Sequence, residues 1–201
     1  MKRTFIVIPL LCVLMLAACG KPDNTVSSAK RTPTNAKTAS SQAITDSRPV
    51  GQSLVREIMK AGKQGLIPDC EFPVKTTSIE EVYKKWGEPG DINDVPAANG
   101  TFAIYWNKRI VIGFNKNSIV FDIRSYKDAL KSIKLSDITT VLGSPESERQ
   151  LNQESILVYP ASSTYKMRFI FPQITRENPD PMLDHISLQY PQGNLDNTEI
   201  Q

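Results

Sequence analysis

The sequence predicts an α+β fold in which helices cover an antiparallel sheet. Two helical segments each end in Gly-x-Pro, and each is followed by three strand-like runs, the last of which alternates as a half-buried strand does. The two series match in order and in the spacing of their apolar residues. This match indicates a tandem repeat of helix-helix-three-strand units, over about residues 50–125 and 126–192. The pattern leaves open whether the strands of both units join in one sheet.

Apolar residues at helical spacing locate the helices. Segment 79–86 has them at its first, fourth and eighth positions, and segment 135–142 repeats this pattern. Each segment therefore buries one face of a helix. Each unit also begins with an extra helix, expected at 54–64 in the first unit and at 126–132 in the second.

Capping residues set the ends of the two main helices. Ser78 with Glu81 fits a capping box, in which each side chain bonds the backbone N–H of the other residue. Gly87 and Gly143 follow the last apolar residues, and a proline comes two residues later in both cases. Glycine adopts the left-handed backbone that ends a helix and proline cannot continue one, so both helices should stop there.

Six runs rich in β-branched and aromatic residues are strand-like, and two of them, 118–124 and 185–190, alternate as strands of a sheet buried on one side do. They are 101–106, 109–114 and 118–124 in the first unit and 155–159, 166–171 and 185–190 in the second. The connector 172–183 carries three prolines and predicts a projecting loop. The Gly-, Pro- and Asn-rich stretch around Asp91 and Asp94 also predicts a loop.

Residues 1–18 are typical of a lipoprotein signal peptide. A basic start precedes an apolar run, and Leu16-Ala17-Ala18-Cys19 matches a lipobox. The run is shorter than the roughly 20 apolar residues of a membrane span. We therefore expect cleavage before Cys19 and acylation of its thiol. Membrane lipid is then a partner through acylated Cys19, and the protein sits on the extracytoplasmic face of the cell membrane.

Residues 19–48 follow as the lipidated cysteine plus a stalk, and 49–201 form the globular domain. The stalk is rich in Ser, Thr, Ala and Lys and poor in large apolar residues, a composition that favours disorder. The net charge of +3 comes from the leader and the stalk, which leaves the domain slightly acidic. Nucleic acid is therefore not expected as a partner.

Few residues offer redox or metal chemistry. Once the leader is removed and Cys19 is acylated, Cys70 is the remaining thiol, so no intrachain disulfide is expected. We interpret Cys70 as a spectator thiol. His185 is the only histidine, whereas a zinc site needs three or four His, Cys or carboxylate ligands. We expect no cofactor and no metal, and we expect His185 at the surface or at a strand rim.

Carboxylates keep a second function open. A glycoside hydrolase needs two of them on either side of the bond that it cleaves. Glu80 and Glu81 suit the start of a helix better, because acidic groups interact favourably with the helix dipole there. The candidates are Glu80, Glu81, Glu88, Asp91, Asp94, Asp122 and Asp184.

Aromatic residues on the strands are the better indication of a binding surface. Tyrosine and tryptophan often anchor interfaces, and about half of the side chains on a strand face away from the core. The residues predicted to bind are Tyr105, Trp106, Tyr159 and Tyr165. Ordinary packing under the helices is the alternative for each of these rings.

The chain resembles the YjgB family, uncharacterised lipoproteins of Gram-positive bacteria whose C-terminal domain has no assigned function. The resemblance covers about residues 54–190 and rests on the Gly-x-Pro helix ends, the strands AIYW (103–106) and LVY (157–159), and the lipobox. The layout is also similar to beta-lactamase-inhibitor-like and outer-membrane-assembly lipoprotein modules. This resemblance implies an extracytoplasmic protein-binding module more than an enzyme, and it supplies no catalytic residues.

These features predict a membrane-anchored extracytoplasmic lipoprotein, a non-catalytic module that binds an envelope protein or a cell-wall polymer. The alternative is a cell-wall or glycan-directed hydrolase that uses paired carboxylates. Two acids that face each other in a concave cleft would favour the hydrolase. A flat aromatic sheet would favour binding.

Overall fold

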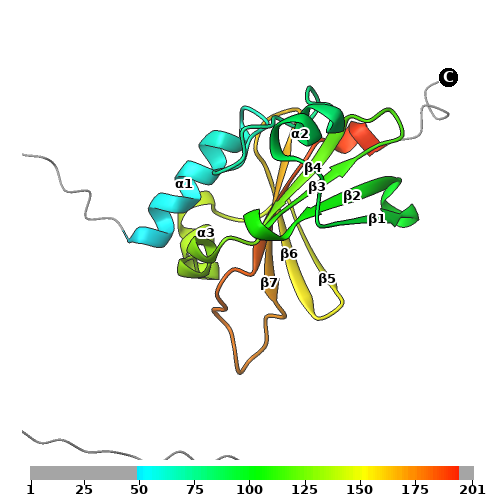
Figure 1. Ribbon diagram of the computed structural model, residues 1–201. Coiled ribbons are helices and arrows are strands. Elements are labelled where there is room, and N and C mark those ends of the chain that lie inside the picture. The colour runs from blue at the N-terminus through cyan, green and yellow to red at the C-terminus, as the bar shows by residue number, and fades with distance from the viewer. Residues whose placement is uncertain (1–48, 195–201) are drawn as a thin grey trace, which may run out of the picture. The chain divides into compact units, whose positions relative to one another are not determined.

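The computed structural model describes residues 49–194 of the chain (Figure 1). The predicted signal peptide of residues 1–18, the lipidation site Cys19 and the predicted stalk up to residue 48 lie outside the described residues. Residues 195–201 lie outside them as well. Within 49–194, no helix combines the length and the apolar character that crossing a bilayer requires.

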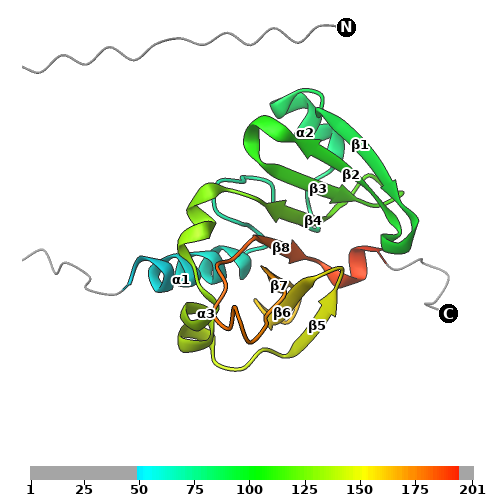
Figure 2. The same cartoon turned by 90° about the horizontal axis from the view of Figure 1, so that it is seen from below.

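In the described part of the chain, eight antiparallel strands form one sheet. Their order is β1-β2-β3-β4-β8-β7-β6-β5, so the two sets of four strands meet at β4 and β8 (Figure 2). The strands of both predicted units thus share a single sheet. The strands are β1 (Asp91–Val95), β2 (Gly100–Tyr105), β3 (Ile110–Phe114), β4 (Val120–Ser125), β5 (Ser147–Leu151), β6 (Glu154–Pro160), β7 (Lys166–Pro172) and β8 (His185–Gln189).

Three α-helices of the described part pack on one face of this sheet (Figure 1). They are α1 (Val50–Gly62), α2 (Ile79–Trp86) and α3 (Leu135–Leu142). The capping box of α2 is confirmed, because Ser78 Oγ accepts from the Glu81 N–H at 3.3 Å and the Ser78 N–H donates to Glu81 Oε2 at 2.8 Å. Both helices end at a glycine as predicted, and Gly87 and Gly143 have φ angles of 80° and 73°. Their ψ angles of −171° and −149° lie outside the left-handed helical region, so the predicted left-handed conformation is wrong in detail.

The core fills the space between the helices and the facing side of the sheet. Val55 of α1, Val82 of α2 and Ile138 of α3 are fully buried there. They pack against alternate strand residues such as Ile123 and Phe169. Burial of an apolar side chain of this size contributes about 1.5–3 kcal/mol. The core therefore determines which face of the sheet the helices cover.

Several predicted elements differ from the structure. The sequence does not indicate β1 and β5, and Asp91 and Asp94 lie in β1 and not in a loop. Both are edge strands with mostly exposed side chains, so no apolar alternation marks them. Segment 126–132 is not an α-helix, because its residues form the short 3₁₀ helix η3. The 3₁₀ helices are η1 (Pro96–Ala98), η2 (Trp106–Lys108), η3 (Asp128–Ser132) and η4 (Pro191–Asn194).

The two halves of the sheet match in a detail at the end of each helix. The Tyr105 hydroxyl donates to the Gly87 carbonyl at 3.1 Å, and the Tyr159 hydroxyl donates to the Gly143 carbonyl at 2.9 Å. The first half has two α-helices and four strands, and the second has one α-helix and four strands, so the predicted helix-helix-three-strand unit is not confirmed. The origin of the two halves as a tandem repeat stays a prediction.

Candidate functional site

The face of the sheet opposite the helices carries a band of buried polar residues, and we call it the open face. Side chains alternate along a strand, so these residues are the sequence neighbours of the core residues. A buried polar group is costly unless it is bonded, which makes such a band a candidate for function. Its central residues are Asp122, Arg124, Arg168, His185, Ser187 and Gln189.

Asp122, only 1% exposed, is the centre of one cluster on the open face. Its carboxylate accepts from Ser187 Oγ at 2.8 Å and from Nε and Nη2 of Arg124 at 3.1 and 3.0 Å. The Arg124 guanidinium also lies over the Phe102 ring, 4.5 Å from its centroid. Burial lowers the pKa of Arg124, but the Asp122 charge outweighs this effect and the pKa is raised. Asp122 and Arg124 therefore form a mutually compensated ion pair between a buried carboxylate and a half-buried guanidinium.

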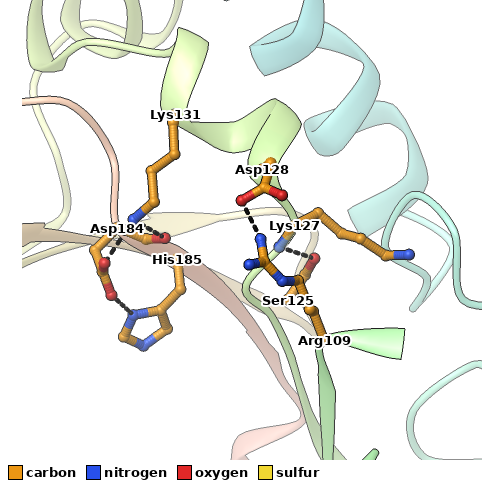
Figure 3. A network of polar contacts seen from close by, with 7 residues as sticks. All are labelled: Arg109, Ser125, Lys127, Asp128, Lys131, Asp184 and His185. Atoms are coloured by element: carbon orange, nitrogen blue, oxygen red, sulfur yellow. Dashed lines mark hydrogen bonds and ion pairs between the residues drawn. The ribbon is translucent and has the colours of Figure 1, made fainter. Parts of the chain in front are cut away.

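A second cluster surrounds His185 at the start of β8 (Figure 3). Asp184 accepts from Lys131 Nζ at 2.6 Å on one carboxylate oxygen and contacts His185 Nδ1 at 2.8 Å with the other. The His185 ring stacks on Tyr126 with the centroids 4.4 Å apart. Burial lowers the pKa of His185 although Asp184 opposes this shift. Burial alone would raise the pKa of Asp184, but bonds from Lys131 and His185 lower it, so this carboxylate stays ionised.

Within residues 49–194, one group of side chains has the spacing of a metal site. Glu154, Asp184 and His185 each offer a ligand atom, and these atoms lie within 4.8 Å of one another. Both carboxylate oxygens of Asp184 are already engaged by Lys131 and His185, so a metal ion would have to displace these contacts. The expectation of no metal stays a prediction.

Two large cavities of the described part open on this face, one in each half of the sheet. The β5–β8 cavity has a volume of about 670 Å³. It is lined by Glu146, Ser147, Arg149, Gln150, Leu151, Ile156, Val158, Lys166, Arg168, Gln189 and Pro191. The β2–β3 cavity has a volume of about 480 Å³. It is lined by Ile104, Tyr105, Trp106, Arg109, Ile110, Val111, Tyr126, Asp128 and Lys131.

The β2–β3 cavity has charged walls whose charges are paired. Arg109 forms an ion pair with Asp128 of η3, and Lys131 of η3 forms one with Asp184 (Figure 3). The wall of this cavity is therefore held by contacts between the sheet and η3. Its rim includes Trp106, whose ring is exposed.

The four aromatic residues predicted to bind lie in different places. Tyr105 and Tyr159 are each 3% exposed and belong to the core, which corrects their predicted place on a binding surface. They pack on the helix side because they alternate with Ile104 and Val158, which face the open side, although Tyr105 also contributes to the lining of the β2–β3 cavity. Trp106 is 65% exposed at the β2–β3 cavity. Tyr165 is half-buried beside the core, and binding by Trp106 and Tyr165 stays a prediction.

The carboxylates considered for hydrolysis are engaged in separate contacts. Glu81 caps α2, Asp94 lies on the edge strand β1, and Asp122 is paired with Arg124. Glu154, absent from the predicted set, is the acid that lies near Asp184. Neither Glu154 nor Asp184 is among the residues that line the two large cavities.

Cys70 and His185 are both buried. Burial raises the pKa of the Cys70 thiol to about 11, so almost none of it is thiolate at neutral pH. This environment favours the interpretation of Cys70 as a spectator thiol. His185 is 7% exposed, so it does not lie at the surface, but it is the first residue of β8, as the strand-rim alternative expected. The stacking Tyr126 and the neighbouring strands cover its ring.

Strand alternation contains a signal for the charged residues that the sequence prediction missed. In β7, Arg168 lies between Met167 and Phe169, which are both buried in the core, so Arg168 must face the opposite side. Arg149 occupies the same face on β5. Their proximity depends on which strands pair, and sequence alternation carries no information on pairing between distant strands.

Comparisons with known proteins agree with this fold. The crystal structure of a DUF4309 family protein (YjgB) from Bacillus subtilis subsp. subtilis str. 168 has a TM-score of 0.57 and 16% identity, over 71% of this chain and 99% of that chain. An extracellular protein containing a SCP domain from Bacillus anthracis str. Ames has a TM-score of 0.39 and 14% identity, over 56% and 42% of the two chains. No curated protein matches the chain. The likeness to YjgB at this identity shows the fold alone.

A match to a family model assigns the chain to a protein family, which structural likeness alone does not do. The model described as "Domain of unknown function (DUF4309)" matches residues 55–189, which begin within α1 and end with β8. The matched segment includes both halves of the sheet and all lining residues of the two cavities except Pro191. The chain therefore belongs to the DUF4309 family, in agreement with its resemblance to the YjgB family.

Proposed function

We propose that this protein is a membrane-anchored extracytoplasmic lipoprotein that acts as a non-catalytic binding module. The open face is its binding surface, and the partner is an envelope protein or a cell-wall polymer. The observation that carries this proposal is the pair of cavities on the sheet face opposite the α-helices, one on each side of a polar band. Ligand sites are typically concave and combine apolar groups with fixed polar ones, and both kinds of group line each cavity.

The anchor rests on the lipobox Leu16-Ala17-Ala18-Cys19 and the short apolar run before it. Two or more acyl chains hold a protein durably on a bilayer at about 0.8 kcal/mol per buried CH₂. The Cys19→Ser variant should lose incorporation of labelled fatty acid and leave the membrane fraction. A wild-type chain that takes up no fatty acid would contradict the anchor.

Binding is favoured over hydrolysis by the state of the acidic groups. A glycosidase needs one carboxylic acid that keeps its proton, hence one with a raised pKa. Asp122 is held by Arg124 and Ser187, and the pKa of Asp184 is lowered. The alternative, a cell-wall or glycan-directed hydrolase, is supported by the proximity of Glu154 to Asp184. Release of soluble sugar from cell walls by wild type but not by Glu154→Gln would establish the hydrolase.

A duplicated unit would explain why each half of the sheet has its own cavity. Support comes from the symmetric strand order and from the equivalent Tyr105 and Tyr159 bonds to the helix-ending glycines. We propose that the two halves are copies of one helix-and-four-strand unit. Ancestral sequences reconstructed separately for the two halves should converge, and a failure to converge would contradict this origin.

Crosslinking in intact cells tests the binding face. A photoreactive residue at Trp106 or at Leu151 lies at one or the other cavity, and both positions are exposed. The matched control is Lys60, which is exposed on α1 on the helix side. We expect the same captured partner from both cavity positions and none from Lys60. Equal capture from all three positions, or none from the cavities, would contradict the proposed face.

A further inference from the structure

The β5–β8 cavity contains a half-buried arginine without a carboxylate partner. Arg168 lines this cavity, and among the described residues no carboxylate oxygen lies within 4.0 Å of its guanidinium. Removal of a charge from water is costly unless a counter-charge or hydrogen bonds compensate for it. The partial burial of the Arg168 charge therefore lowers the stability of the fold, and other interactions of the domain must offset this loss.

Arg124 provides the comparison on the same face. The register places Arg124, Ser187 and Arg168 side by side across β4, β8 and β7. Arg124 donates twice to Asp122, and the Asp122 charge raises its pKa in spite of burial. Burial lowers the pKa of Arg168, and the more distant Asp122 does not compensate for it. The charges of Arg124 and Arg149 lower it further.

The rest of the cavity suits an anionic ligand of some length. Arg149 projects from β5 into the same cavity, and Gln189 adds a polar side chain on the β8 side. Lys166 is already paired with Glu146, 2.6 Å from Nζ to Oε1. Ile156 and Val158 of β6 form an apolar floor, because the register places Ile156 opposite Arg149 and Val158 opposite Arg168.

We propose that the β5–β8 cavity binds an oxyanion, a phosphate or a carboxylate group carried on an extended ligand, with Arg168 and Arg149 as its cationic contacts. The planar guanidinium donates to such groups through two parallel N–H bonds. The apolar floor contacts the carbon chain between the charged groups. The β2–β3 cavity does not share this property, because its Arg109 and Lys131 are paired with Asp128 and Asp184. The inference rests on the proposed binding role of the open face and names the chemistry of its ligand.

Titration of the full chain in detergent tests this inference by calorimetry. The probes are inorganic phosphate, an oligomer of glycerol phosphate, an oligogalacturonate and a neutral dextran. We expect one or both anionic oligomers to bind more tightly than inorganic phosphate, and dextran not to bind. The preferred oligomer distinguishes a phosphate source from a carboxylate source. Added salt should weaken the binding, because exposed Arg149 is screened.

Two variants and a matched control locate the site. Arg168→Gln should weaken oligomer binding by about tenfold or more, the effect of one lost bond to a charged group. Arg149→Gln should weaken it by less, because Arg149 is exposed. Arg176→Gln removes an equal charge from the exposed connector 172–183 and should leave the affinity unchanged.

Thermal unfolding separates a binding role of Arg168 from a structural one. The proposal expects Arg168→Gln to unfold at the same or a higher temperature, because a poorly compensated buried charge is removed. Unfolding at a markedly lower temperature, or equal affinities of Arg168→Gln and Arg176→Gln, would overturn it. The absence of binding to both anionic oligomers would overturn it as well. If neither anionic oligomer bound but crosslinking at Trp106 and Leu151 still captured a partner, the proposed binding function would stand. Only the inference that the ligand is anionic would then be wrong.

Discussion

The two main helices begin with different caps although they occupy equivalent places in the fold. α2 begins at Ser78, whose side chain forms a local capping box with Glu81. α3 follows Lys134, which has no oxygen in its side chain to offer. A carboxylate from elsewhere, that of Asp180 in the connector 172–183, accepts from the Ser136 N–H at 2.8 Å and from Ser136 Oγ at 3.0 Å.

The backbone contact at the two helix starts is nevertheless the same. The Ile79 N–H donates to the Ser118 carbonyl at 2.8 Å, and the Leu135 N–H donates to the Pro181 carbonyl at 3.1 Å. In the first half the connector between β3 and β4 is short, whereas the connector between β7 and β8 is long. The comparison teaches that a cap absent from the local sequence can be supplied by a longer connector to the next strand.

The largest effect should come from the residues that anchor the two helices to the sheet. Ile138→Ala should lower the free energy of unfolding by about 2–5 kcal/mol, because it leaves a cavity in the core. Val82→Ala should lower it by less, because it removes one carbon fewer. Urea denaturation followed by circular dichroism measures both. We expect one cooperative transition in each variant, and two separate transitions would show that the halves are independent.

Removal of either cap should have a smaller effect. Ser78→Ala and Asp180→Ala should each cost about 1 kcal/mol. The distinguishing measurement is hydrogen exchange at the Ser136 amide, which Asp180→Ala should accelerate and Ser78→Ala should not. Glu177→Ala, in the same connector and exposed, is the matched control. Unchanged exchange at Ser136 in Asp180→Ala would contradict the cap supplied by the connector.

The tyrosine bonds at the helix ends should be equivalent. Tyr105→Phe and Tyr159→Phe each remove a hydroxyl bond to a glycine carbonyl, which is worth about 0.5–1.5 kcal/mol. Chemical denaturation of both variants checks this. Unequal losses, with one variant at wild-type stability, would argue against equivalent halves.

The smallest effect concerns pH and belongs to one half alone. The pKa of His185 is lowered in the folded state by burial, below its unfolded value of about 6.5. Between the folded and the unfolded pKa, the unfolded state therefore binds more protons than the folded state. The contribution of His185 to stability is complete above pH 6.5 and is lost as the pH falls towards the folded pKa. Asp184, Glu154, Arg124 and Tyr126 are the charged or titratable groups around His185.

Denaturation midpoints between pH 7 and pH 5 test this effect. They should fall with decreasing pH in the wild type and fall less in His185→Gln. The lowered pKa of Asp184 acts in the same direction only near its unfolded value of about 3.9, outside this window. An identical pH dependence of both proteins would mean that His185 does not titrate differently on folding.

Local signals predict much of this fold. The apolar spacing and the caps locate α2 and α3, and strand-like runs of β-branched and aromatic residues locate six of the strands. The edge strands β1 and β5 escape prediction because they bury little and therefore need no apolar alternation. Segment 126–132 has helical composition, but only the five residues of η3 form a turn before the chain must enter α3.

The candidate site is harder to predict, because it depends on strand pairing. Alternation alone indicates that Arg168 faces away from the core. The partners of Asp122, by contrast, come from its own strand and from Ser187, 65 residues away. Residue type alone predicts that Tyr105 and Tyr159 lie on a binding surface. In the structure, their sequence neighbours Ile104 and Val158 face the open side of the sheet instead.

The last strand among the described residues, β8, has a consequence for the order in which the sheet can close. It lies between β4 and β7, so the centre of the sheet cannot pair before residues 185–189 are available. In the exported lipoprotein that we propose, a chain that passed N-terminus first through a translocation channel would lack this central pairing until residue 189 emerged. The strand order would thus delay closure of the sheet until almost the whole domain had crossed.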